Sequence, residues 1–143
     1  MTPFEFLNNH VLSYVAPSPI DGVGLFALKD IPKGVDVFKK WDGETGIYSM
    51  KFKKAKLLPQ SVLKLILKSF SNQVTNDDSN IYYRLINGVN FLISEPTSLL
   101  NTGFENGNID SINGICLKST KAGEELLGNY GKLSEGKPHI EVI

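Results

Sequence analysis

The sequence predicts a mainly β domain with a short helical insert. Two observations favour strands: short apolar runs broken by Pro and Gly fill residues 11–38, and Asn-Gly pairs at 87–88 and 113–114 separate β-rich runs. A third observation favours one helix, because apolar residues recur at helical spacing from residue 60 onward. The chain has 143 residues, and domains usually contain roughly 100 to 200 residues. We therefore expect a single domain over residues 1–143.

The first half of the chain is predicted to contain strands joined by tight turns. Pro and Gly separate three apolar runs, which are residues 11–15, 23–28 and 35–38. Residues 29–38 have a counterpart at residues 118–127. In both segments a predicted strand leads into a turn that contains Lys and Gly, and a second predicted strand follows. We expect Gly34 and Gly123 to occupy turn positions that a side chain resists.

Residues 60–73 are predicted to form one amphipathic helix. Its apolar face is expected to contain Leu63, Ile66, Leu67, Phe70 and Val74. Lys64 and Lys68 fall on the opposite, solvated face. Residues 51–68 contain six lysines and no acid, although the whole chain has 15 basic and 15 acidic residues. This lysine-rich segment is expected either to favour acidic partners or to be an ordinary solvated helix face.

Each Asn-Gly pair predicts a β-hairpin. The first pair joins residues 81–86 to 89–93, and the second joins residues 109–112 to 115–118. Asn and Gly tolerate the positive φ angles that a type I′ turn requires at both central residues. We therefore expect the two runs of each hairpin to pair with one another.

The composition argues against several classes of site. Equal numbers of basic and acidic residues leave no net charge to hold a nucleic-acid backbone. Cys116 is the only cysteine, and His10 and His139 lie near the two chain ends. A Cys and His zinc site or a Ser-His-Asp hydrolase is therefore not expected, and no metal is predicted.

Adjacent carboxylates occur twice, as Asp77-Asp78 and Glu124-Glu125. Neighbours on a strand point to opposite faces, which does not suit an acid–base pair. Both pairs are therefore interpreted as surface charges.

A cytoplasmic location is expected. The N-terminus lacks a basic region, and no stretch approaches the ~20 apolar residues of a membrane span. A single cysteine also fits a reducing compartment.

Three separated motifs have residues that suit a binding site. The Gly22-Val23-Gly24 triplet precedes a β-rich run, where glycines let the backbone approach a ligand closely. Residues 99–108 end in a loop rich in Asn and Gly, whose amides can both donate and accept. A third motif ends in Asn129-Tyr130-Gly131, and a buried phenol there would need a polar partner. Each motif alone is a weak signal.

Together, in this order and spacing, the motifs resemble the SET-domain family of protein lysine methyltransferases over about residues 11–131. The segments that carry the resemblance are residues 22–27, 30–34, 121–126 and 129–131. The resemblance implies the SET-domain (β-clip) fold, with small twisted sheets around a knot-like threaded C-terminal segment. It also implies a variable insert at about residues 42–80. Zinc-binding cysteine clusters are absent from the sequence, so residues 132–143 are expected to close the site.

The resemblance also implies the site residues. S-adenosylmethionine would be the methyl donor and S-adenosylhomocysteine the product, with Thr102 at the position of the family's His. The implied cofactor-binding positions are Gly22, Val23, Gly24, Leu25, Asn101 and Thr102. Tyr130 matches the catalytic tyrosine. Tyr82 and Tyr83 are candidates for the wall of the substrate channel, and as strand neighbours only one of them is expected to face it.

The resemblance thus predicts an S-adenosylmethionine-dependent protein lysine N-methyltransferase. Its partner would be a protein that carries a target lysine, without direct nucleic-acid or membrane binding. Two alternatives stay open: a catalytically silent SET-like binding module, and a β-clip module that binds a carbohydrate or small ligand. The small size without zinc clusters resembles bacterial or viral members, in the latter case located in the host cytoplasm.

Overall fold

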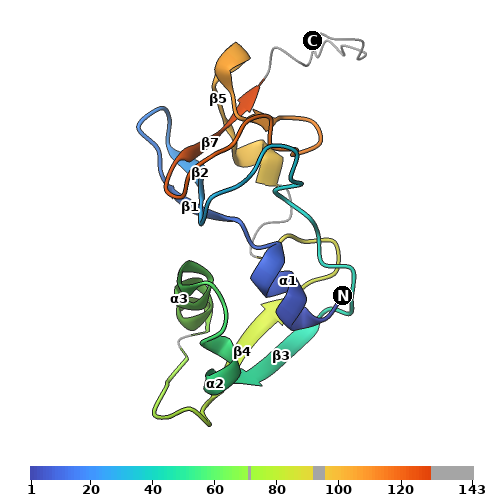
Figure 1. The fold of residues 1–143 in the computed structure, drawn as a ribbon, viewed down its shortest axis with the longest axis vertical. Coiled ribbons are helices and arrows are strands. Elements are labelled where there is room, and N and C mark those ends of the chain that lie inside the picture. The colour runs from blue at the N-terminus through green and yellow to red at the C-terminus, as the bar shows by residue number, and fades with distance from the viewer. Residues whose placement is uncertain (71, 92–95, 130–143) are drawn as a thin grey trace. The chain divides into compact units, whose positions relative to one another are not determined.

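The structure is a computed structural model that describes residues 1–70, 72–91 and 96–129 (Figure 1). It is mainly β, with small sheets and a few short helices, which confirms the broad fold class. The chain divides into two compact units. Unit 1 comprises residues 1–11 and 39–94, and unit 2 comprises residues 12–38 and 95–143. The expected insert, residues 42–80, falls within unit 1.

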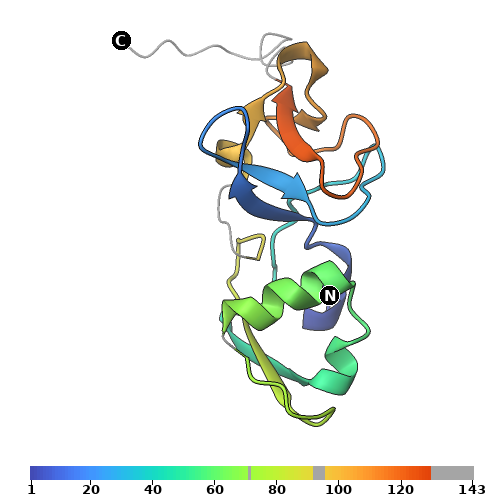
Figure 2. The ribbon, with the colours of Figure 1, turned by 90° about the vertical axis from the view of Figure 1, so that its left-hand side faces the viewer.

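Unit 2 contains one small mixed sheet (Figures 1 and 2). Its strands are β1 (Ser13–Pro17), β2 (Val23–Ala27), β5 (Asn101–Thr102), β6 (Ile109–Asp110) and β7 (Glu125–Asn129). β1 and β2 form an antiparallel hairpin, and β7 runs antiparallel to β2. β5 and β6 both run parallel to β7. The sheet therefore brings the three sequence motifs of unit 2 onto adjacent strands.

Buried aliphatic side chains hold this sheet together. Leu25, Ile109 and Leu126 have no exposed surface, and each lies on a different strand. Burying one such side chain contributes about 1.5–3 kcal/mol. The register pairs Leu25 with Leu126, so the shared core fixes β2 against β7.

The two similar segments of unit 2 lie against each other. The backbones of Ile31 and Thr120 exchange hydrogen bonds of 2.7 and 2.9 Å. Gly34 and Gly123 have φ of +91° and +85°, as expected for turn positions that a side chain resists. The predicted strand at 35–38 is wrong, because only an isolated bridge forms at Asp36. There the Asp36 carboxylate accepts from the backbone N–H of Phe38, which curls the chain.

The second Asn-Gly pair closes a longer loop than predicted. Ile109 and Cys116 form an antiparallel bridge, so the two flanking runs do face each other. Gly114 has φ of +74°, but Asn113 does not have the positive φ of a type I′ turn. The Asp110 carboxylate instead accepts from the N–H groups of Ile112 and Asn113, and these contacts organise the wider loop.

The connection between β5 and β6 passes very close to β7. A Cβ on Gly107 would lie 2.5 Å from the backbone carbonyl of Gly128. Gly107→Ala is therefore expected to destabilise the fold by about 2 kcal/mol or more. Urea unfolding monitored by circular dichroism would measure this. Gly46→Ala is the matched control, because its nearest contact would be 3.9 Å away. Equal stability of the two variants would contradict this close approach.

Unit 1 contains a two-stranded antiparallel sheet and three helices (Figure 2). Its elements are α1 (Pro3–Asn9), β3 (Gly46–Lys51), α2 (Phe52–Ala55), α3 (Gln60–Ser69) and β4 (Asn80–Leu85). α2 packs on both strands and α3 packs on β4. Thr2 and Glu5 form a reciprocal capping box that starts α1, whose buried residues are Phe6 and Leu7.

The first predicted hairpin is wrong for the described residues, because β4 pairs with β3 and not with residues 89–91. Only Gly88 of the Asn87-Gly88 pair has a positive φ, which excludes a type I′ turn. The turn instead lies beside Trp41. The backbone N–H of Gly88 donates to the Trp41 carbonyl, and the backbone N–H of Trp41 donates to the Val89 carbonyl. Phe91 then has φ of +54°, so extended backbone does not continue through it, and residues 92–93 lie outside the described residues.

The predicted helix is present but ends four residues early, at Ser69. Val62 and Ile66 are its buried residues, whereas Phe70 is 38% exposed and Leu63 and Leu67 are half-buried. The Asn72 side chain explains the end, because it bonds to the Ile66 carbonyl and to both backbone groups of Tyr82. Lys64 and Lys68 are exposed, as predicted.

In the part of the chain that the structure describes, no helix has the length and apolar character needed to cross a membrane.

Candidate functional site

Both glycines of the first motif occupy positions that disfavour a side chain. Gly22 has φ of +48°, a conformation that side chains disfavour. Gly24 is buried on β2, and a Cβ there would overlap a carboxylate oxygen of Glu125 and lie 3.0 Å from Nδ2 of Asn101. The absence of a side chain at Gly24 thus makes room for two polar groups from other strands.

Asn101 connects the second motif to the first. From β5, its Nδ2 donates to Oε2 of Glu125 at 2.9 Å and reaches the carbonyl oxygens of Asp21 and Val23 at 3.2 and 3.3 Å. The structure therefore brings Gly22, Gly24 and Asn101 together, although they are almost 80 residues apart. Their role in cofactor binding stays a prediction.

Glu125 is a site residue that the sequence interpretation missed. Its carboxylate accepts from the hydroxyl of Ser18, at 2.9 Å for each oxygen, as well as from Asn101. The interpretation of both glutamates as surface charges is correct for Glu124, which is exposed, and wrong for Glu125, which is half-buried. Strand alternation could have signalled this difference, since neighbours point to opposite faces.

Asn108 is a second missed residue, and it holds the same region in place. Its side chain donates to the Glu125 carbonyl at 3.1 Å and accepts from the N–H of Leu127 at 2.7 Å. Asn108 is 7% exposed, so both polar ends of the amide are used inside unit 2. We assign it a structural role in fixing β7.

The other implied cofactor positions differ in what their side chains do. Leu25 is fully buried in the core, so only its backbone could contact a ligand. Val23 is 51% exposed. The hydroxyl of Thr102 accepts from the N–H of Phe104 at 2.9 Å, at the start of the 3-10 helix Phe104–Asn106.

The tyrosine candidates of the channel wall lie in unit 1, whereas the glycine and asparagine positions lie in unit 2. Tyr82 is 45% exposed and Tyr83 is 3% exposed, so these neighbours do point to opposite faces. Tyr83 stacks on Tyr48 with ring centroids 6.0 Å apart. Burial, with a smaller contribution from Tyr48, raises the pKa of Tyr83 to about 12, which keeps its phenol protonated.

Tyr83 also lines a small pocket of about 230 Å³ within unit 1, whose other walls include residues of α1, α2 and β3. Lys54 lies at this pocket with its ammonium 5.1 Å from the ring centroid of Phe4. Tyr130, the implied catalytic residue, and the tail 132–143 lie outside the described residues.

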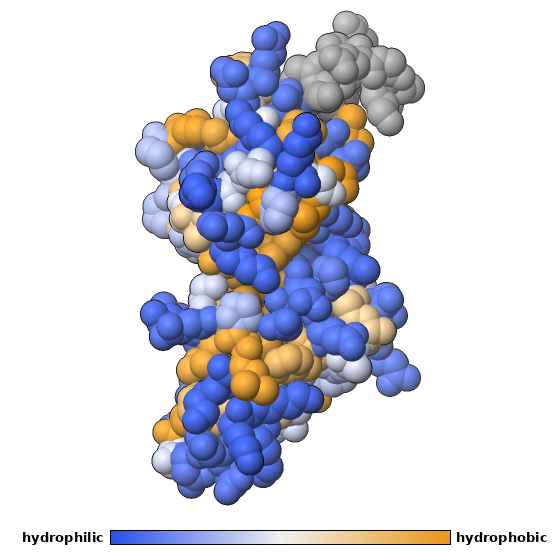
Figure 3. Space-filling view, viewed as in Figure 1, coloured by the Kyte–Doolittle hydropathy of each residue, from blue (hydrophilic) through white to orange (hydrophobic). Residues whose placement is uncertain are grey.

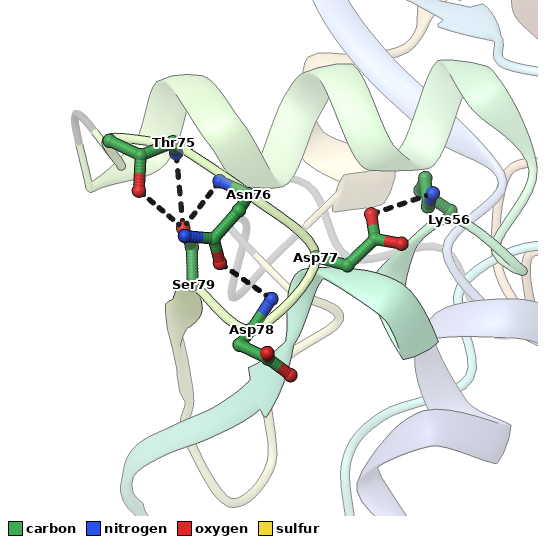
Figure 4. Close-up of polar contacts among 6 residues, drawn as sticks. All are labelled: Lys56, Thr75, Asn76, Asp77, Asp78 and Ser79. Carbon is green, nitrogen blue, oxygen red and sulfur yellow. Dashed lines mark hydrogen bonds and ion pairs between the residues drawn. The ribbon is translucent and has the colours of Figure 1, made fainter.

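The lysine-rich segment has acidic neighbours that the linear sequence does not show. Lys56 forms an ion pair of 2.8 Å with Asp77 (Figure 4). The loop that carries Asp77 is held by Ser79, whose Oγ accepts from the N–H groups of Thr75 and Asn76. Figure 3 shows hydrophilic side chains over this end of unit 1. The positive patch is thus partly neutralised, and among the described residues Lys53 and Lys54 have no carboxylate partner.

Comparisons with known proteins place this chain in no established family. No protein-family model matches it, and no curated protein matches it. Among solved structures, a crystal structure of a candidate histone methyltransferase from Plasmodium falciparum is 14% identical, with a TM-score of 0.32. That match covers 84% of this chain and 93% of the other. A likeness of this degree does not show a shared fold.

No group of three or more His, Cys, Asp or Glu side chains among the described residues is arranged to hold a metal ion.

Proposed function

We propose that this chain is an S-adenosylmethionine-dependent protein lysine N-methyltransferase of the SET-domain type. The observation that supports this most is the convergence of Gly22, Gly24 and Asn101 beside β7. The strand β7 ends at Asn129, directly before Tyr130 in the sequence. The strands β2 and β5, which carry Gly24 and Asn101, are both neighbours of the strand that directly precedes Tyr130 in the sequence.

The residues at this site suit the proposed cofactor. Beside Gly24, the Glu125 carboxylate and the Asn101 amide lie where a side chain would begin, so polar groups line the backbone of β2 at this site. The amide nitrogen of Asn101 donates to the carbonyls of Asp21 and Val23 and to Glu125. No described residue donates to its oxygen, which could therefore accept from an ammonium group. When bound, S-adenosylmethionine supplies an activated methyl group on a positively charged sulfur.

The chain itself would bind and orient the reactants. A lysine side chain has an ordinary pKa near ~10.4, and burial next to a positive charge favours its neutral, nucleophilic form. Tyr130 would orient this amine through its hydroxyl. No strong base is needed for such a transfer, which depends mainly on alignment of the reacting atoms.

Binding of the cofactor is the first prediction that tests this function. S-adenosylhomocysteine at 100 times its Kd should stabilise the native state by about 2.7 kcal/mol, which corresponds to a rise in Tm of about 5 to 10 °C. Differential scanning fluorimetry measures the shift, with adenosine as the control ligand. No shift at millimolar concentration would contradict the proposal. Binding without transfer of label to any lysine peptide would support the silent binding module instead.

Substrate selection by unit 1 is a second prediction. Charge reversal at Lys53 and Lys54 should slow methylation of a lysine peptide with acidic flanks and reduce its salt dependence, since these cations have no carboxylate partner among the described residues. Lys56 is left unchanged because it pairs with Asp77. The matched control reverses Lys64 and Lys68 on the exposed face of α3. Equal rates for both double variants at low salt would exclude this patch from substrate binding.

A further inference from the structure

We propose that the Glu125 carboxylate makes the site selective for the positively charged methyl donor over its neutral product. This inference rests on the proposed function, because it concerns the ligands of the same site. It assigns a role in product release to Glu125, which the sequence interpretation treated as a surface charge.

In the part of the chain that the structure describes, no cation pairs with the carboxylate of Glu125. Its hydrogen-bond donors are neutral groups, the hydroxyl of Ser18 and the amide of Asn101. Glu125 is half-buried, so water screens this charge less than it would screen an exposed one.

The charge also lies at the backbone that a ligand would approach. One carboxylate oxygen of Glu125 occupies the space where a side chain of residue 24 would begin. Asn101 contacts the same oxygen and the carbonyls of the preceding loop. The carboxylate is therefore held by Ser18 and Asn101 beside Gly24 of β2.

The two ligands differ by one unit of charge. S-adenosylmethionine has an ammonium, a carboxylate and a sulfonium, which sum to +1. Loss of the methyl group leaves a neutral thioether, and the product has no net charge. A carboxylate at this site with no cation paired to it among the described residues would favour the donor over the product on the order of fivefold. Such a preference would help the product to leave after each transfer.

Glu125→Gln tests this, because the amide keeps the size of the side chain and removes its charge. Isothermal titration calorimetry gives the Kd of each ligand for the wild type and the variant. The ratio of the product Kd to the donor Kd should fall about fivefold in Glu125→Gln. Glu124→Gln is the matched control, since it removes the same charge from an exposed neighbour and should leave the ratio unchanged.

A second variant keeps the test decisive if Glu125→Gln does not fold. Ser18→Lys leaves Glu125 in place and adds an ammonium at the residue that now donates to its carboxylate. The same fall in the ratio is expected. If either folded variant weakens both ligands equally or neither, the inference is wrong while the proposed function stands. If neither ligand binds the wild-type chain, the proposed function fails and the inference fails with it.

Discussion

Tyr130→Phe is expected to lower kcat by about a hundredfold or more. The change keeps the aromatic ring and removes only the hydroxyl that would orient the amine. Misalignment of reacting groups by about 1 Å is enough for a loss of this size. Because the lost contact matters mainly in the transition state, the Kd of S-adenosylmethionine should stay within about twofold. Steady-state transfer of labelled methyl to a lysine peptide measures kcat, and calorimetry measures the Kd.

The control for this variant is Tyr14→Phe. Tyr14 lies on β1 and stacks on Phe26 with ring centroids 5.7 Å apart, so it is a packed aromatic of unit 2. Its variant should keep wild-type turnover. If Tyr130→Phe also turns over normally, Tyr130 is not the catalytic tyrosine, and the enzymatic proposal loses its central residue.

Gly24→Val should abolish measurable cofactor binding, with a Kd at least about a hundredfold weaker. Even the first carbon of a side chain at residue 24 would overlap Glu125 and press on Asn101. Neither group can move freely, because Glu125 also holds Ser18 and Asn101 also contacts two loop carbonyls. The added bulk would therefore displace the polar groups that line the site. Titration with S-adenosylhomocysteine measures the loss.

Loss of binding must be separated from loss of the fold. Gly46→Val makes the same change on β3 of unit 1, where the nearest atom to a new Cβ would be 3.9 Å away. It should bind as the wild type does. A folded Gly24→Val chain, as judged by circular dichroism, that keeps wild-type affinity would place the cofactor site elsewhere in the molecule.

Local features of the fold follow from the sequence because they depend on neighbouring residues. β1 and β2 overlap the first two predicted runs, although β1 continues to Pro17, and α3 begins at Gln60, directly after Pro59, as predicted. The positive φ at Gly34 and Gly123 also matches the expectation, since the lack of a side chain alone makes such turns favourable. Strand alternation correctly separates the exposed Tyr82 from the buried Tyr83.

Only the tertiary structure decides which strands pair and which polar groups meet. The local pattern around Asn87-Gly88 does not reveal which segment pairs with this turn. In the structure the segment is that of Trp41, through backbone hydrogen bonds. The end of α3 depends on Asn72 reaching across to Tyr82. Glu125 looks like an ordinary surface charge in the sequence because its donor Ser18 lies 107 residues away. Local sequence determines the propensities of the chain, whereas hydrogen bonds and packing between distant segments determine the site.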